Sequence, residues 1–183
     1  MPYHRTRRIL TIAAALLSVG AAFAGCSDGV QPDEQETINR SLDQLRQVTA
    51  KYQNISTALA NGYLETPLTN CWQHVSAGGM GYHYQNPDFV NDGKVTLLEP
   101  ELLMYEPQAD GRLVLVGMEY IVSKDQWQGS SNPVLLGQTL QEHPDLPIYK
   151  LHIWLWRDNQ SGIFADWNPA VTCDHAADKT IFE

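Results

Sequence analysis

The chain has 183 residues, of which 43% are hydrophobic and 18% are charged, a balance typical of one globular domain. Its formal net charge at neutral pH is −9. Because an acidic surface repels phosphate backbones and anionic headgroups, the composition argues against nucleic-acid binding and against a polybasic membrane-binding surface.

Residues 1–25 have the pattern of an export signal. Three arginines among the first eight residues precede an uncharged, alanine-rich run over residues 9–24, which is short for a membrane span. The run leads into residues 23–26 (FAGC), which resemble the lipobox of bacterial lipoproteins. The resemblance implies a lipid such as palmitate on Cys26, a membrane anchor, and a location in the periplasm or on the outer face of the membrane. An ordinary secretion signal with a chance cysteine is the alternative.

After a polar tether at residues 26–32, an amphipathic helix is predicted over residues 33–62, with Gly62 as its C-terminal cap. Because an isolated helix is marginal in water, we expect its apolar stripe to pack on the rest of the domain. The alternative is a stripe that binds a protein partner. The stripe repeats every three or four residues and consists of Ile38, Leu42, Leu45, Val48, Tyr52, Ile55 and Leu59.

Strand patterns dominate the remainder, a β-rich part over residues 63–183. Residues 78–84 (GGMGYHY) combine a strand with three glycines, which allow positive φ or a close backbone approach. A phosphate-binding loop would instead need a helix directly after the glycines. Residues 101–106 and 112–123 are predicted to form a hairpin, and Gly117 indicates a bulge or a close approach in its second strand.

The last elements complete the predicted fold. Residues 149–156 (YKLHIWLW) alternate large side chains on both faces, which predicts a central strand. The segment 124–148 lacks periodicity and is expected to be a lid or to hold short elements, and the tail is expected to fray from about residue 174. The sequence therefore predicts a single α+β domain, with a long N-terminal helix packed on a curved antiparallel sheet or a small β-barrel.

Cysteine usage predicts one disulfide. If Cys26 carries a lipid, Cys71 and Cys173 remain, and an exported compartment allows them to pair. A thiolate metal site is less favoured because no C-x-x-C spacing is present. The bridge would close a loop of about 100 residues, which the chain-entropy model values at roughly 4–5 kcal/mol.

From Cys71 onward the chain resembles a family of exported bacterial and archaeal proteins without an established activity. The resemblance covers roughly the last two thirds of the chain and implies an exported single domain, but no reaction. Its motifs are GMGYHYQNP at 79–87, PELLMYE at 100–106, VGMEY at 116–120, LHIWLW at 151–156, Gly162, Phe164, WNP at 167–169 and Cys173.

Imidazoles and carboxylates inside predicted strands are the candidates for a site, because an unpaired charge buried in a sheet is costly. Alternation along the hairpin places Glu119 on one face with Leu113 and Leu115, which predicts an inward-facing acid. The candidate ligand-binding residues are His83, Glu106, Glu119, His152 and Trp154. The other histidines after the signal, His74, His143 and His175, lie in polar or proline-flanked stretches and are expected to be solvated.

His83, Glu119 and His152 are the candidate metal ligands, since two imidazoles and one carboxylate suit a divalent transition metal. The residues leave three interpretations open: a structural pairing of Glu119 with a histidine or tyrosine, a pocket for an organic ligand, and a metal site. No catalytic residue is identified, because the chain has no H-x-H, H-E-x-x-H or G-x-S-x-G motif.

Three functions fit these observations. The first is an exported, lipid-anchored module that binds a small molecule or a metal ion in a pocket under segment 124–148. The second is a metal-assisted hydrolase or lyase that uses the same residues. The third is a structural envelope protein that binds a protein partner through its N-terminal helix. The first two require the side chains of His83, Glu119 and His152 to converge.

Overall fold

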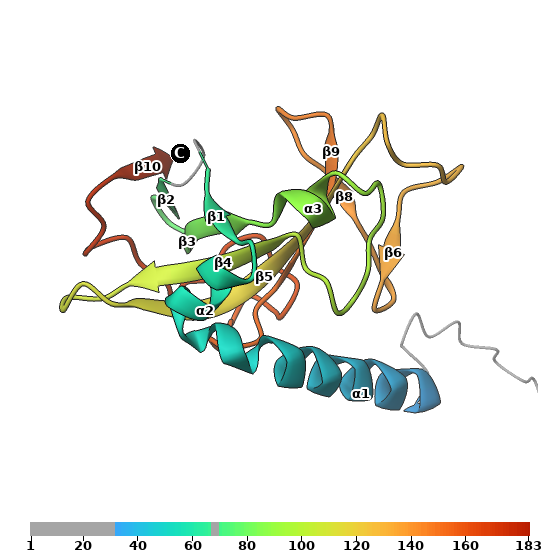
Figure 1. Ribbon diagram of the computed structural model, residues 1–183, viewed down its shortest axis with the longest axis horizontal. Helices are drawn as coiled ribbons and strands as arrows, with labels where there is room; N and C mark the ends of the chain where they lie inside the picture. Colours follow the sequence, from blue (N-terminus) through green and yellow to red (C-terminus); the bar gives the residue numbers. More distant parts are fainter. Residues whose placement is uncertain (1–31, 67–69) are drawn as a thin grey trace, which may run out of the picture. The chain divides into compact units, whose positions relative to one another are not determined.

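The computed structural model describes residues 32–66 and 70–183. The expected signal peptide and Cys26 lie outside these residues. Within the described part of the chain, no helix is both long and apolar enough to cross a membrane. The predicted α+β class is correct, because an N-terminal helical segment is followed by a mixed sheet (Figure 1).

The helical segment is broken into three pieces, so the continuous helix expected over 33–62 is wrong. The pieces are α1 at Pro32–Thr49, a 3-10 turn at Ala50–Gln53 and α2 at Ile55–Ala60. The break falls at Asn54, whose backbone is extended and whose side chain accepts a hydrogen bond from the Ser56 amide at 3.0 Å. A side chain that caps a new helix in this way ends the preceding one.

The apolar stripe of the helical segment belongs to the main hydrophobic core. Leu45 and Tyr52 are buried in one cluster with Leu103 and Tyr105 of the sheet. The Tyr105 hydroxyl donates a hydrogen bond to the carbonyl oxygen of Tyr52 at 2.7 Å. At the end of the stripe, Leu59 is 44% exposed, which differs from the expected pattern.

The sheet follows the order β10-β2-β3-β4-β5-β9-β8, with β1 beside β3. Its ends, β10 and β8, lie on opposite sides of the domain (Figure 1), so the described sheet is open and the alternative of a closed β-barrel is wrong. The strands are β1 Leu64–Glu65, β2 Cys71–His74, β3 Gly78–Gln85, β4 Leu102–Pro107, β5 Leu113–Ser123, β8 Gln141–Glu142, β9 Ile148–Ile153 and β10 Lys179–Phe182.

Short elements complete the fold. Three expectations are wrong: the fraying tail, the purely antiparallel sheet and the length of the strand over residues 149–156. The helix α3 spans Pro87–Val90, and the strands β6 (Val134–Leu135) and β7 (Gln138–Thr139) pair within segment 124–148, which also holds β8. The tail does not fray at residue 174, because β10 pairs in parallel with β2 and makes the sheet mixed rather than antiparallel. The strand expected over 149–156 ends at Ile153.

A bulge in the hairpin decides which way Glu119 faces. The register between β4 and β5 shifts between Met104 and Tyr105, opposite Gly117. The extra residue reverses the alternation, so Leu115 joins Met118 in the main core and Glu119 points to the other face. The expectation that Glu119 shares a face with Leu113 and Leu115 is therefore wrong, although the bulge expected at Gly117 is present.

The second face of the sheet is covered by the segment after β9, which the disulfide ties down. Cys71 and Cys173 form the predicted bridge and are both buried. Gly78, at φ 96°, leaves room for this segment, since a Cβ there would lie 2.1 Å from the Asn168 carbonyl oxygen. The glycines of residues 78–84 therefore serve close backbone packing.

Candidate metal centre

Three strands bring the candidate metal ligands together on the second face of the sheet. Glu119 on β5 lies directly opposite His152 on β9. His83 on β3 lies opposite Met104 of β4, which in turn pairs with Gly117 of β5. The three polar side chains converge above β4, in the middle of the sheet.

The geometry is that of a carboxylate between two imidazoles. The Oε2 atom of Glu119 lies 3.5 Å from Nε2 of His83, and its Oε1 atom lies 3.5 Å from Nε2 of His152. One donor atom from each residue can be chosen so that all lie within 4.8 Å of one another. Each carboxylate oxygen thus faces a different imidazole nitrogen.

All three side chains are buried, and three of the four imidazole nitrogens have no hydrogen-bond partner among the described residues. The residues are 4% (His83), 8% (Glu119) and 1% (His152) exposed. Within the described residues, Nδ1 and Nε2 of His83 and Nε2 of His152 are buried without a hydrogen-bond partner. Each such atom costs about 1–3 kcal/mol. A cation held between the three residues would remove that cost at both Nε2 atoms.

The electrostatics also favour a bound cation. Burial lowers the pKa of His83 to about 4, against an opposing influence of Glu119, so His83 is neutral at pH 7 and has a free lone pair. In the described part of the chain, no lysine or arginine forms an ion pair with Glu119. A buried carboxylate beside a neutral imidazole is stabilised when a metal ion neutralises it.

Asp166 orients His152. Its Oδ1 atom lies 3.3 Å from Nδ1 of His152 and also accepts a hydrogen bond from the ammonium group of Lys150. The bond from His152, followed by that from Lys150, holds the pKa of Asp166 well below its usual range despite partial burial. A carboxylate that accepts the Nδ1 proton leaves the Nε2 lone pair directed at Glu119.

Trp154 supports His152 from one side. The two rings stack with an interplanar angle of 17°, and the indole N–H donates to the Ala165 carbonyl oxygen at 2.6 Å. Trp154 belongs to a small buried cluster with Met80, Met104 and Val171. Its position indicates a packing role beside the site.

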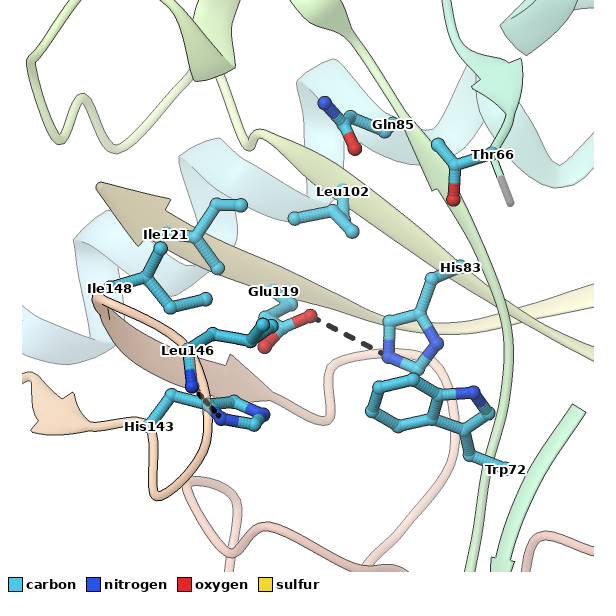
Figure 2. A pocket seen from close by; sticks show the side chains of 10 residues that line it. All are labelled: Thr66, Trp72, His83, Gln85, Leu102, Glu119, Ile121, His143, Leu146 and Ile148. Atoms are coloured by element: carbon cyan, nitrogen blue, oxygen red, sulfur yellow. Dashed lines mark hydrogen bonds and ion pairs between the residues drawn. The ribbon is translucent and has the colours of Figure 1, made fainter. Parts of the chain in front are cut away.

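A cavity of about 200 Å³ opens next to the site (Figure 2). His83 and Glu119 form its polar end, and Trp72 lies beside His83 with 5.4 Å between the ring centroids. The opposite walls are mainly aliphatic and come from β4, β5 and the start of β9, with Gln85 of β3 and Thr66 next to Leu102 (Figure 2). Their residues are Leu102, Ile121 and Ile148, with Leu146 at the rim.

Glu106, the remaining candidate, is placed elsewhere. Its carboxylate forms an ion pair with Arg157 and accepts a hydrogen bond from the Thr172 amide at 3.0 Å. Gln108 donates to the same carboxylate at 3.1 Å. Because these partners satisfy the buried charge, Glu106 ties the segment after β9 to β4 and is separate from the three metal candidates.

Three residues near the site were not among the predicted ligands. Lys150 could have been recognised, because strand alternation places it on the same face as His152, where an ammonium group needs an acid. Asp166 lies in an irregular segment with no periodic signal. His143 was expected to be solvated, but it is partly buried and lines the cavity.

Comparison with protein-family models, curated proteins and solved structures found no match for this chain. The resemblance to a family of exported proteins therefore stays a prediction.

Proposed function

We propose that this protein is an exported, lipid-anchored module that binds a divalent transition-metal ion through His83, Glu119 and His152. The observation that carries the proposal is a buried carboxylate between two buried Nε2 atoms, neither of which forms a hydrogen bond in the described part of the chain. Structural pairing alone does not account for it, because it leaves those atoms without hydrogen bonds.

The ligand types favour zinc, cobalt, nickel or iron over calcium and magnesium, which prefer oxygen ligands. Two ligands that each lie about 2 Å from one ion are roughly 3.3 Å apart in a tetrahedral site. The two nitrogen–oxygen separations of 3.5 Å are close to this value. The chosen donor atoms of the three residues lie up to 4.8 Å apart, so a small rotation of the histidine side chains is required to bring all of them to bonding distance from one ion.

Export and anchoring rest on the signal pattern and the cysteine at its end. The disulfide supports this part of the proposal, because such bonds persist in oxidising compartments outside the cytoplasm. A metal-binding module in that compartment is exposed to environmental metal ions.

The test is metal binding by the purified protein after treatment with a chelator. We expect one equivalent of Zn²⁺ or Co²⁺ per chain by calorimetry and elemental analysis, together with an increase in the melting temperature. Replacing His83, Glu119 or His152 with Gln should lower the affinity at least about ten-fold.

Two variants serve as matched controls. His175→Gln changes an exposed histidine, and Glu106→Gln changes a buried glutamate on the neighbouring strand. Both should keep the metal affinity of the parent protein, although Glu106→Gln should lose stability because Arg157 loses its partner. Absence of stoichiometric metal, or equal affinity in the Glu119 and Glu106 variants, would overturn the proposal.

A further inference from the structure

The cavity beside the metal candidates has the size and lining of a small aliphatic ligand site. Its volume of about 200 Å³ is somewhat larger than the roughly 150 Å³ of a cavity that holds benzene. Leu102, Ile121 and Ile148 form its walls, and Leu146, 37% exposed, stands at the rim. This space suits a chain of about four to seven carbon atoms.

The charge at the polar end of the cavity favours an anion. Among the described residues that line the cavity, Glu119 is the only acidic side chain, and none is a lysine or an arginine. A divalent ion bound to this one carboxylate would retain a net charge of +1. Because burying an unbalanced charge is costly, a ligand with a single negative charge would neutralise the site.

His143 supplies a donor of fixed direction. Its Nδ1 atom accepts hydrogen bonds from the backbone amides of Asp145 and Leu146, at 3.1 Å and 3.2 Å. A neutral imidazole that accepts at Nδ1 must carry its proton on Nε2. Figure 2 shows this ring turned into the cavity on the side of Glu119, where the Nε2 proton is available to an oxygen of a ligand.

From these observations we infer that the cavity binds a short-chain aliphatic carboxylate. One carboxylate oxygen occupies the coordination position on the metal that the three protein ligands leave open. The other oxygen accepts a hydrogen bond from Nε2 of His143. The aliphatic chain lies against Leu102, Ile121 and Ile148. This inference rests on the proposed metal site, and it adds the chemical class of the ligand.

The test uses the protein loaded with Co²⁺, whose visible spectrum reports on ligands that enter the coordination sphere. Acetate, butyrate and hexanoate are titrated at constant ionic strength, with hexan-1-ol and hexylammonium as uncharged and cationic probes of the same length. We expect the affinity to rise about three- to four-fold for each added methylene group up to hexanoate. Both hexan-1-ol and hexylammonium should bind more weakly than hexanoate.

Two variants test the contacts of the aliphatic end and of the carboxylate end separately. Leu146→Trp narrows the rim and should abolish the dependence on chain length while leaving Co²⁺ binding intact. Leu98→Trp, at a leucine of similar exposure away from the cavity wall, is its control. His143→Asn keeps an acceptor for the backbone amides of Asp145 and Leu146 but has no donor in the position of Nε2. It should weaken all three carboxylates by roughly ten-fold and by the same factor, because it removes one charge-assisted hydrogen bond.

The outcomes distinguish the two proposals. If the chelated protein takes up no Co²⁺, the metal site fails and the ligand inference fails with it. If Co²⁺ binds but acetate and hexanoate have equal affinity, or neither changes the spectrum, the metal site stands and the ligand inference is wrong. Hexanoate that binds equally well without metal would overturn the proposed coordination.

Discussion

The Nδ1 atom of His152 lies 3.3 Å from the Oδ1 atom of Asp166, on the side of the ring away from Glu119. This contact links the irregular segment after β9 to the centre of the sheet. It determines which nitrogen of His152 is available to a ligand, because the carboxylate accepts the proton of the other one.

Asp166→Asn tests this orienting role. We expect metal affinity to fall about ten- to hundred-fold, as is common when the partner of a metal-bound histidine is removed. Lys150→Met is the matched control, because it removes the other partner of Asp166 and leaves the His152 contact in place. Calorimetry at pH 7 measures both. Equal losses in the two variants would mean that Asp166 acts only through the general stability of the segment.

Glu101 should make stability depend on pH. It is 1% exposed, and burial raises its pKa from 4.5 to about 9, against hydrogen bonds that include one from the Ile121 amide. The folded protein therefore keeps this proton at pH 7, whereas the unfolded chain releases it above pH 4.5. The contribution to stability is complete below pH 4.5 and is lost progressively as the pH rises towards 9, by at most about 1.4 kcal/mol per pH unit.

Glu101→Gln should remove this slope, since the amide keeps an acceptor for Ile121 and carries no titrating proton. Urea unfolding of both proteins at pH 5, 6.5 and 8 gives the difference in the free energy of unfolding. We expect the variant to become more stable relative to the parent protein as the pH rises. Parallel pH profiles would show that Glu101 is ionised in the folded protein.

The disulfide should supply a large share of the stability. It joins residues that are 102 positions apart, and the chain-entropy model values such a loop at roughly 4–5 kcal/mol. Cys71→Ser with Cys173→Ser should lower the free energy of unfolding by about that amount, measured by denaturant titration. Intact mass before and after thiol blocking checks the bond in the parent protein. A double variant as stable as the parent would contradict the predicted effect.

Gly81 should tolerate no side chain. Its φ is 82°, and a Cβ would lie 2.3 Å from the Tyr105 carbonyl oxygen on the neighbouring strand. Gly111 has a similar φ of 80°, with no atom within 4 Å of the same position. Gly111→Ala should therefore cost only the backbone strain, about 1 kcal/mol, whereas Gly81→Ala should cost several-fold more. Equal changes in melting temperature would mean that the strand moves aside easily.

Cys26 should anchor the protein to a membrane through a lipid. In the native host, Cys26→Ser should shift the protein from the membrane fraction to the soluble fraction, and palmitate labelling should be lost. Metal affinity should not change, because the proposed ligands are at positions 83, 119 and 152. A protein that stays in the membrane fraction without labelling would contradict the lipoprotein prediction.

The sequence by itself determined the features that depend on local chemistry. Strand patterns predicted the β4–β5 hairpin, and the apolar stripe predicted the buried side of the helices except at Leu59. The cost of isolated charges in strands singled out His83, Glu119 and His152 as partners. These signals are local, because each depends on residues within one element or on the burial of one side chain.

Only the tertiary structure decided the register and the partners from irregular segments. A one-residue bulge turned Glu119 away from Leu115, and an ion pair with Arg157 separated Glu106 from the site. Asp166 reaches the site from an irregular segment that the disulfide and the close packing on Gly78 hold in place, and His143 reaches it from the connection between β8 and β9. Such contacts join residues far apart in the chain, so no periodicity within a single segment can encode them.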